Sequence, residues 1–149
     1  MSIAIRPATQ GDLSVLMTLY THLGSNNAQQ ADRRTEETFA RILETPGMHL
    51  FLLEEDGVTR ASCYLNVIDN LTHDSQPYAL IENVVTHADA RQRGFAKAVM
   101  QHAVAFAWSA GCYKVMLMTG KVDNIPFYEA CGFDASEKHA LIVRRPANA

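Results

Sequence analysis

The spacing of apolar residues changes from alternation to helical periodicity near the start of the chain. Ile3 and Ile5 alternate with less apolar neighbours and predict a short strand that ends at Pro7. Apolar residues then recur with helical spacing from Leu13 to Tyr20, which predicts a helix with one apolar face. The chain is therefore expected to open with a strand followed by a helix.

Turn and capping residues separate the elements that follow. The tetrapeptide Thr9-Gln10-Gly11-Asp12 has the form of a capping box ahead of the first helix. Asp56-Gly57 between two apolar runs predicts a hairpin turn. Further expected elements are a short helix through Phe39 to Leu43 that stops at Pro46-Gly47, strands at 49–54, 60–68, 78–86, 114–119 and 139–144, helices at 95–109 and 124–131 with Asn124 as the cap of the latter, and loops at 25–34 and 69–77.

The order of these elements predicts a mixed α/β (α+β) fold with helices on both faces of one sheet. The helix at 95–109 is apolar nearly all round, with a thin polar stripe of Lys97 and Gln101, so it is expected to be buried against the sheet. No internal repeat or long linker divides the sequence. We therefore expect a single domain over residues 1–149.

Composition excludes several classes of function. Hydrophobic residues make up 48% of the chain and charged residues 19%, which is a globular balance. The net charge of -3 gives no indication of a nucleic-acid partner. No stretch approaches the roughly 18–20 apolar residues of a membrane span, and the first residues do not resemble a signal peptide. Three cysteines and six histidines lack disulfide or metal-ligand spacing, so we expect a cytoplasmic protein without a metal.

The turn Arg91–Ala96, between an expected strand and an expected buried helix, has the character of an anion site. The first N–H groups of a helix are unpaired, and the helix dipole favours negative charge there. Gly94 allows close approach of the backbone, while Arg91, Arg93 and Lys97 add positive charge. The alternative interpretation is a glycine-containing loop with solvated arginines. The turn is not a P-loop, and the G-x-G-x-x-G fingerprint of dinucleotide-dependent oxidoreductases is absent.

Three segments, in order and with appropriate spacing, resemble one known family. They are Ile81-Glu82-Asn83-Val84-Val85, the turn Arg91-x-x-Gly94-x-Ala96, and Asn124-Ile125-Pro126-Phe127-Tyr128-Glu129-Ala130-Cys131-Gly132-Phe133. Together they are similar to the GNAT superfamily of N-acetyltransferases. The resemblance is specific from about Tyr78 to Phe133, and before that it rests on element order and on the opening Ile5, Arg6, Ala8 and Asp12.

The resemblance implies a sheet that is mixed but mostly antiparallel, with one splayed parallel strand pair. Acetyl-CoA is expected between those two strands, 78–86 and 114–119, where its pantetheine arm replaces a missing strand. Val84 and Val85 also suit plain core packing, and the two interpretations are compatible because the backbone would do the binding. The expected donor-binding residues are Val84, Val85, Thr86, Arg91, Gln92, Arg93, Gly94, Phe95, Ala96, Lys97 and Asn124.

Tyr128 and Glu82 are the expected catalytic residues. By resemblance, Tyr128 is the general acid that protonates the departing CoA thiolate; the alternative is a buried core tyrosine. Glu82 lies among apolar strand residues, and a base there would remove the proton of the attacking ammonium. The alternative for Glu82 is an exposed or hydrogen-bonded strand residue, and His87, Asp69 and Asp123 are weaker candidates for the base.

The acceptor is expected to be the primary amine of a small molecule. Many family members have an asparagine seven residues before the catalytic tyrosine, where this chain has Lys121. Asn124 instead matches a subset that resembles glucosamine-6-phosphate N-acetyltransferases, although Asn83 replaces the acidic residue of that subset. An aminosugar phosphate is therefore one lead. The acceptor pocket is expected near 23–34 and 69–77.

Direct transfer in a ternary complex is the expected mechanism, so Cys63, Cys112 and Cys131 are interpreted as small core residues and not as nucleophiles. Two alternatives stay open: an acyl-CoA sensor without turnover, and acetylation of a protein lysine or N-terminus. The resemblance also implies a homodimer. The charge and the lack of a long apolar stretch predict no nucleic-acid or membrane partner.

Overall fold

The computed structural model describes residues 1–24 and 30–148. It contains two compact units, Met1–Leu117 and Met118–Ala149, and each is described by itself below. Of the loop expected over 25–34, residues 25–29 lie outside the described part of the chain, and Arg33 and Arg34 already belong to a helix. The single domain over 1–149 stays a prediction.

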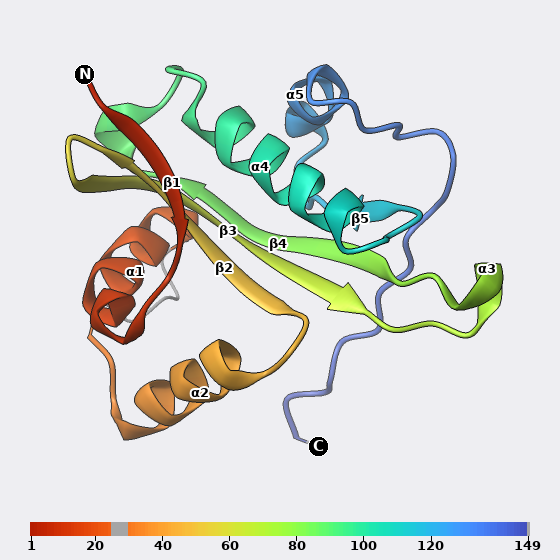
Figure 1. Cartoon of the computed structure of the whole chain (residues 1–149), viewed down its shortest axis with the longest axis horizontal. Helices are drawn as coiled ribbons and strands as arrows, with labels where there is room; N and C mark the ends of the chain where they lie inside the picture. Colours follow the sequence, from red (N-terminus) through yellow and green to blue (C-terminus); the bar gives the residue numbers. More distant parts are fainter. Residues whose placement is uncertain (25–29, 149) are drawn as a thin grey trace. The chain divides into compact units, whose positions relative to one another are not determined.

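The first unit is built on one sheet whose strands are neighbours in chain order (Figure 1). The strands are β1 (Ile3–Pro7), β2 (Met48–Glu55), β3 (Val58–Ile68), β4 (Tyr78–Thr86) and β5 (Val115–Leu117). The first four pair antiparallel, whereas β5 pairs parallel to β4. The expected mixed, mostly antiparallel sheet with one parallel pair is confirmed.

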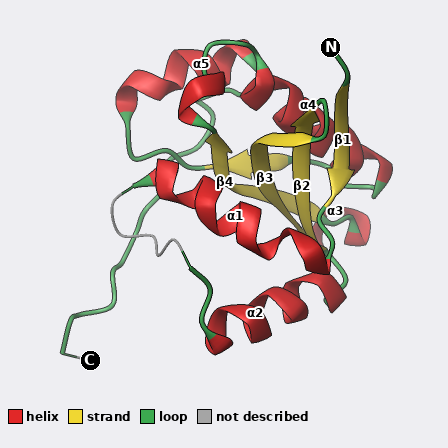
Figure 2. Cartoon of the chain, turned by 90° about the vertical axis from the view of Figure 1, so that its left-hand side faces the viewer, coloured by secondary structure: helices red, strands yellow, loops and turns green. Residues whose placement is uncertain are grey.

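Helices cover both faces of this sheet, as expected (Figures 1 and 2). The longer ones are α1 (Leu13–Tyr20), α2 (Arg33–Glu44) and α4 (Phe95–Ser109). Short helical turns are η1 (Gln10–Asp12), η2 (Thr21–Leu23), α3 (Thr72–Ser75) and η3 (Ala88–Ala90). The α3 turn lies inside the loop expected at 69–77 and has left-handed backbone angles at His73 and Asp74.

Strand alternation distributes the core between the two faces. Leu50 and Leu52 of β2 pack with α1 and α2, where Leu16 and Phe39 complete a buried cluster. Phe51, between those leucines, faces α4, and its ring lies 5.4 Å from that of Phe106. The helix α4 is thus buried against the sheet, as its apolar composition predicts.

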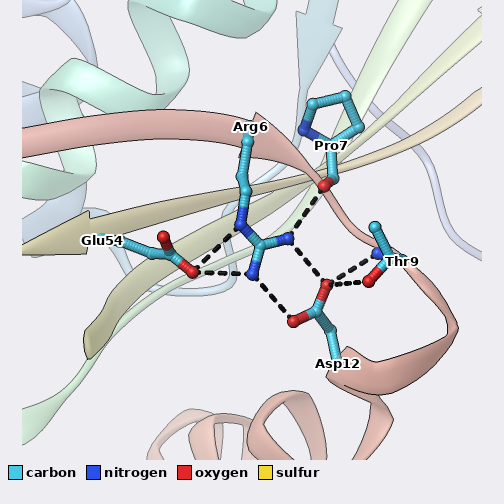
Figure 3. Close-up of polar contacts among 5 residues, drawn as sticks. All are labelled: Arg6, Pro7, Thr9, Asp12 and Glu54. Atoms are coloured by element: carbon cyan, nitrogen blue, oxygen red, sulfur yellow. Dashed lines mark hydrogen bonds and ion pairs between the residues drawn. The ribbon is translucent and has the colours of Figure 1, made fainter. Parts of the chain in front are cut away.

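A partly buried ionic network ties β1, β2 and the start of α1 together (Figure 3). Arg6 donates to both carboxylate oxygens of Asp12, at 2.8 and 2.9 Å, and to Glu54 at 2.6 and 3.0 Å. Asp12 also accepts the backbone N–H of Thr9 at 2.7 Å, which completes the expected capping box. The Arg6 guanidinium and these hydrogen bonds hold the pKa of Asp12 far below its usual range.

The second unit contains η4 (Val122–Asn124) and α5 (Ile125–Ala130). The helix α5 ends before Gly132, whose φ is 100°. The expected strand at 139–144 is wrong, because no strand is formed there in the described chain. Leu141 and Val143 are 93% and 95% exposed. Apolar alternation alone does not make a strand, since a strand also needs a hydrogen-bonding neighbour. The expected strand at 114–119 is shorter than expected, and only Val115–Leu117 pairs.

Asp12→Asn is expected to lower the free energy of unfolding by about 1–3 kcal/mol at pH 7, because a charge-assisted network loses its central carboxylate. The folded-state pKa of Asp12 lies below its unfolded value. Its contribution is therefore present above the usual aspartate pKa of about 4 and is lost as the pH falls toward the folded-state value. Urea unfolding of both proteins between neutral and acidic pH measures this shrinking difference.

Glu37→Gln is the control, because it breaks only the exposed pair with Arg33 on α2. Its effect is expected to stay within about 0.5 kcal/mol. A difference between Asp12→Asn and the wild type that does not shrink at acidic pH contradicts the ionic role of Asp12.

Candidate active site

The far edge of β4 is only partly paired. Ala79, Leu80 and Ile81 pair with β5, whereas pairing with β3 continues to Thr86. Among the described residues, no strand pairs with the edge opposite β3 from Glu82 onward. The parallel strand pair therefore ends early and leaves a stretch of β4 backbone open along one side.

A β-bulge interrupts β4 in this open stretch. The register moves from Tyr64↔Glu82 to Ser62↔Val85, so that Asn83 and Val84 together oppose the single residue Cys63. Asn83 has a left-handed backbone with φ 52°, a conformation that asparagine tolerates better than most residues. Bulges of this kind re-aim neighbouring side chains. Here Glu82 and Val85 fall on the same face of the sheet, although an odd step of three positions would place them on opposite faces of a regular strand.

Glu82 lies on the face of the sheet that α1 and α2 cover. It stands directly opposite Tyr64, whose side chain packs against the cluster of Leu50 and Phe39. The Glu82 side chain is half-buried. Within the described part of the chain, its carboxylate makes no hydrogen bond or ion pair.

The same face contains a pocket of about 410 Å³ between α1, α2 and the sheet. Its base is apolar, with Leu16 and Leu50 among the lining residues. The polar side chains that line it are Tyr20, Asp32, Arg34, Thr35, Thr38, Tyr64 and Asn83. A larger hollow of about 710 Å³ lies nearby, but among the described residues it is lined by no strand residue. Only the smaller pocket borders β4.

Two tyrosines that line this pocket have raised pKa values. Burial raises the pKa of Tyr20 to about 12 and also raises the pKa of Tyr64. Both groups therefore carry a proton at neutral pH and can donate or accept a hydrogen bond. Together with Asn83 and the other polar lining residues, they can orient a polar ligand over the apolar base of the pocket.

The turn Arg91–Ala96 has the geometry of an anion cradle. Gln92 and Gly94 have positive φ values of 59° and 81°. Gly94 precedes α4, and the first backbone bond of that helix runs from the Ala98 N–H to the Gly94 carbonyl at 2.9 Å. The N–H groups between those two residues have no partner in the helix and carry its positive dipole end. A Cβ on Gly94 would meet nothing within 4 Å.

The cationic side chains of this turn differ in what they contact. Arg91 donates to the carbonyl of His22 in η2 at 3.3 Å. Arg93 binds both carboxylate oxygens of Glu55 at the end of β2, one of them at 2.9 Å. Lys97 is exposed on α4. The arginine side chains thus hold the turn to neighbouring elements.

Tyr128 and Asn124 lie in the second unit. The Tyr128 side chain is half-buried, and its ring centre lies 5.3 Å from that of Phe127. Burial raises the pKa of Tyr128, and Cys131 adds to the rise. Asn124 stands at the start of α5, but its side chain makes no capping hydrogen bond. The catalytic role of Tyr128 stays a prediction.

The weaker sequence candidates have other surroundings. Nδ1 of His87 accepts the Asp89 N–H at 3.2 Å, and Asp69 and Asp123 are exposed. The core role expected for the cysteines is confirmed for two of them, because Cys63 and Cys112 are buried and all three are free thiols. Burial raises the pKa of Cys63 to about 12, so this thiol is not a nucleophile at neutral pH.

Sequence reasoning missed three features of the site. Tyr20 was assigned only to the apolar face of its helix, and Tyr64 to a strand without a role. The bulge had a signal, because asparagine is a poor strand former and Asn83 interrupts an apolar strand sequence. The partner of Arg93 had none, since Glu55 is 38 residues away in the chain.

Comparison with known proteins agrees with this geometry. Residues 15–133 match the model of the acetyltransferase (GNAT) family. The chain belongs to this family. It is an acetyl-CoA-dependent N-acetyltransferase. The fold expected for a family member is confirmed by a solved structure from Agrobacterium tumefaciens strain C58, which is described as an acetyltransferase. That structure has a TM-score of 0.89, is 39% identical, and the match covers 95% of this chain and 99% of the other.

Curated relatives of this GNAT protein carry one recurring name. Glucosamine 6-phosphate N-acetyltransferase of Trypanosoma brucei brucei is 29% identical in an alignment of 145 residues, and the match covers 93% of each chain. Glucosamine 6-phosphate N-acetyltransferase 1 of Oryza sativa subsp. japonica is 34% identical in an alignment of 111 residues, and the match covers 66% of this chain and 64% of the rice protein.

The described residues contain neither a candidate membrane-spanning helix nor a candidate metal site. None of the described helices has the length and apolar character needed to span a bilayer. In the same residues, no group of three or more histidine, cysteine, aspartate or glutamate side chains is arranged to hold a metal ion.

Gly94→Asp is expected to abolish the stabilisation of this GNAT protein by acetyl-CoA. A ligand at 100 times its Kd stabilises a protein by about 2.7 kcal/mol. A carboxylate at Gly94 would enter the open space beside the turn and repel the pyrophosphate. Thermal unfolding with and without acetyl-CoA measures the effect.

Gly94→Asn is the matched control, because asparagine has nearly the same shape, no charge, and tolerance for left-handed backbone. It is expected to keep part of the stabilisation. A folded Gly94→Asp protein with wild-type affinity for acetyl-CoA would remove the anion site from the interpretation.

Proposed function

We propose that this enzyme transfers the acetyl group of acetyl-CoA to the primary amine of a small molecule, by direct attack in a ternary complex. The observation that carries the proposal is the position of Glu82. Its half-buried carboxylate lies on the face of β4 that borders the 410 Å³ pocket, where the opposite edge of the strand becomes open. A base, an acceptor pocket and a donor groove would then meet on one strand.

The donor is proposed to bind along the open edge of β4. The backbone of Val84, Val85 and Thr86 can pair with the amides of the pantetheine arm, as a neighbouring strand would. The pyrophosphate would then reach the unpaired N–H groups of the turn from Gln92 to Lys97. This path follows the chain direction, because η3 alone separates β4 from the turn.

The proposed chemistry needs one base and one acid. Glu82, directly or through a water molecule, removes a proton from the acceptor ammonium, and the free amine attacks the thioester carbonyl. Collapse of the tetrahedral intermediate breaks the C–S bond, and Tyr128 gives its proton to the departing thiolate. The nitrogen loses its second proton as the neutral amide forms, and this proton restores the phenol, directly or through water. The raised pKa of Tyr128 keeps the phenol protonated before the reaction. The role of a binding module without turnover would leave such a phenol without a purpose.

A small molecule is favoured over a protein acceptor by the pocket itself. Its volume of about 410 Å³ and its apolar base suit a compact ligand. The names of the curated relatives support an aminosugar phosphate as the lead. Among the described residues that line the pocket, Arg34 is the one cationic side chain, and it is therefore the proposed phosphate contact.

Assembly and location are proposals of a different kind. A homodimer is supported by the resemblance to a family whose members often dimerise, and a cytoplasmic location is supported by the cysteine usage.

Glu82→Gln is expected to lower turnover by about 10²–10⁴-fold at low pH, where the acceptor is mostly an ammonium. The deficit is expected to shrink as the pH rises and free amine accumulates. Thiol release from acetyl-CoA, followed across pH with one good acceptor, measures it. Glu37→Gln, which changes an exposed carboxylate on α2, is the control and is expected to behave like the wild type. A deficit that stays constant across pH points to an acceptor-binding role for Glu82.

Tyr128→Phe serves as the companion variant in the same assay, because its loss concerns the leaving group and not the amine. It is expected to lower turnover with acetyl-CoA affinity nearly unchanged. Wild-type turnover of this variant, where chemistry limits the rate, would exclude Tyr128 as the acid.

Arg34→Gln is expected to raise the KM for glucosamine 6-phosphate by about 10- to 100-fold, the size of a lost charge-assisted hydrogen bond. The KM for glucosamine, which has no phosphate, is expected to stay unchanged. Steady-state kinetics with both acceptors separates the phosphate contact from a general effect.

Arg33→Gln is the control for this test, because Arg33 pairs with Glu37 on the exposed side of α2. Equal effects of the two variants would show that Arg34 does not bind the phosphate. If other amines in a panel are acetylated and glucosamine 6-phosphate is not, the aminosugar phosphate is wrong.

A further inference from the structure

The turn Arg91–Ala96 depends on a contact that its own sequence does not contain. Arg93 stands between Gln92 and Gly94, the two residues with positive φ. A left-handed backbone is unfavourable at a residue other than glycine, so the conformation of Gln92 needs support from its surroundings. The side chain of Arg93 is the part of the turn best placed to provide it.

Glu55 holds that side chain with both carboxylate oxygens. The Nη1 atom of Arg93 donates to one oxygen at 2.9 Å, and Nη2 donates to the other. A bidentate pair fixes the plane and direction of the guanidinium, which a single hydrogen bond does not. The guanidinium carbon also lies 4.6 Å from the centre of the Phe95 ring, at the first residue of α4. Arg93 is therefore fixed between β2 and the start of the helix.

Glu55 is itself anchored in the sheet. It is 7% exposed, and Arg60 of β3 forms a second ion pair with it at 3.3 Å. The carbonyl of Arg60 accepts the N–H of His87, the residue that follows β4, at 2.8 Å. The Arg93 guanidinium in particular holds the pKa of Glu55 below its usual range. One carboxylate thus connects the sheet to the turn on the far side of η3.

A carboxylate beside an anion site is at first sight unfavourable, because it would repel the pyrophosphate. The two arginines offset its charge, and both terminal nitrogens of Arg93 are directed to it. Arg93 is therefore not free to act chiefly as a direct phosphate ligand. This position is explained if the backbone N–H groups of the turn bind the phosphate and the Arg93 side chain holds that backbone in place.

We propose that Glu55 is a positioning residue for donor binding, which acts through Arg93 to hold the Arg91–Gly94 backbone in its anion-binding conformation. The inference rests on the proposed donor site at this turn. It assigns Glu55 no contact with the donor and no part in the chemistry.

The test compares two donors that differ in the pyrophosphate. Titration calorimetry measures the Kd of acetyl-CoA and of S-acetylpantetheine, which lacks the pyrophosphate and the nucleotide. Glu55→Gln is expected to weaken acetyl-CoA binding about tenfold, which equals about 1.4 kcal/mol. Binding of S-acetylpantetheine is expected to stay unchanged. A merely structural role would weaken both donors or neither, and either result overturns the proposal. Tighter binding of acetyl-CoA would show that Glu55 acts by repulsion, which also overturns it.

Arg93→Gln removes the more exposed partner of the Arg93–Glu55 pair and is expected to weaken acetyl-CoA binding in the same way. This variant tests the proposal if Glu55→Gln does not fold. Because Glu55 acts through Arg93, the double variant is expected to bind acetyl-CoA no more weakly than the weaker single variant. If the losses of acetyl-CoA affinity in the two single variants add up in the double variant, Glu55 does not act through Arg93. Glu54→Gln is the matched control, since it removes a carboxylate from Arg6 on the neighbouring position of β2. Its acetyl-CoA affinity is expected to equal that of the wild type.

Failure of the proposed function gives a different result. Binding is measured without an acceptor, so a wild-type protein that binds acetyl-CoA but acetylates no amine rejects the transferase proposal and leaves the Glu55 comparison intact. A wild-type protein that binds no acetyl-CoA rejects the donor site, and the inference with it.

Discussion

The one-sided pairing of β4 is the constraint on which the rest of the site depends. Parallel pairing with β5 covers only Ala79–Ile81, whereas β3 supports β4 to its end. A backbone edge without a strand is costly unless it is satisfied by water or by a ligand. The strand can stay ordered because β3 and the buried helix α4 hold it from its other sides. An edge that is both rigid and open is what a peptide-like donor requires.

The bulge at Asn83 converts this strand into a site with two functions. An undistorted strand would alternate strictly, and Glu82 would then not share a face with Val85. The extra residue places both on the side of α1 and α2, with Glu82 opposite Tyr64, which lines the pocket, and Val85 opposite Ser62. The backbone on the open edge of β4 is thereby left for the proposed donor, and the side chains on one face are left for the proposed acceptor. The donor and the acceptor can thus approach one strand from different directions.

Two carboxylates at the end of β2 have parallel tasks on opposite faces of the sheet. Glu54 joins Arg6 and, through it, Asp12 at the start of α1. Glu55 joins Arg60 and Arg93 ahead of α4. In each case an arginine links the sheet to the beginning of a helix. The first linkage fixes a helix that lines the proposed acceptor pocket, and the second fixes the turn proposed to bind the pyrophosphate.

The sequence by itself determined the elements and the order in which they occur. Local signals such as helical periodicity at Leu13–Tyr20, the Asp56-Gly57 turn and the glycine before α4 depend only on neighbouring residues, and each matches the structure. Pairing is different, because a strand exists only with a partner. The apolar residues at 139–144 therefore predicted a strand that does not form, and the length predicted for the strand at 114–119 exceeds that of β5. Tertiary structure alone decided the bulge, the pocket that Tyr64 and Asn83 line, and the contact of Glu55 with Arg93, since each depends on residues brought together from distant parts of the chain.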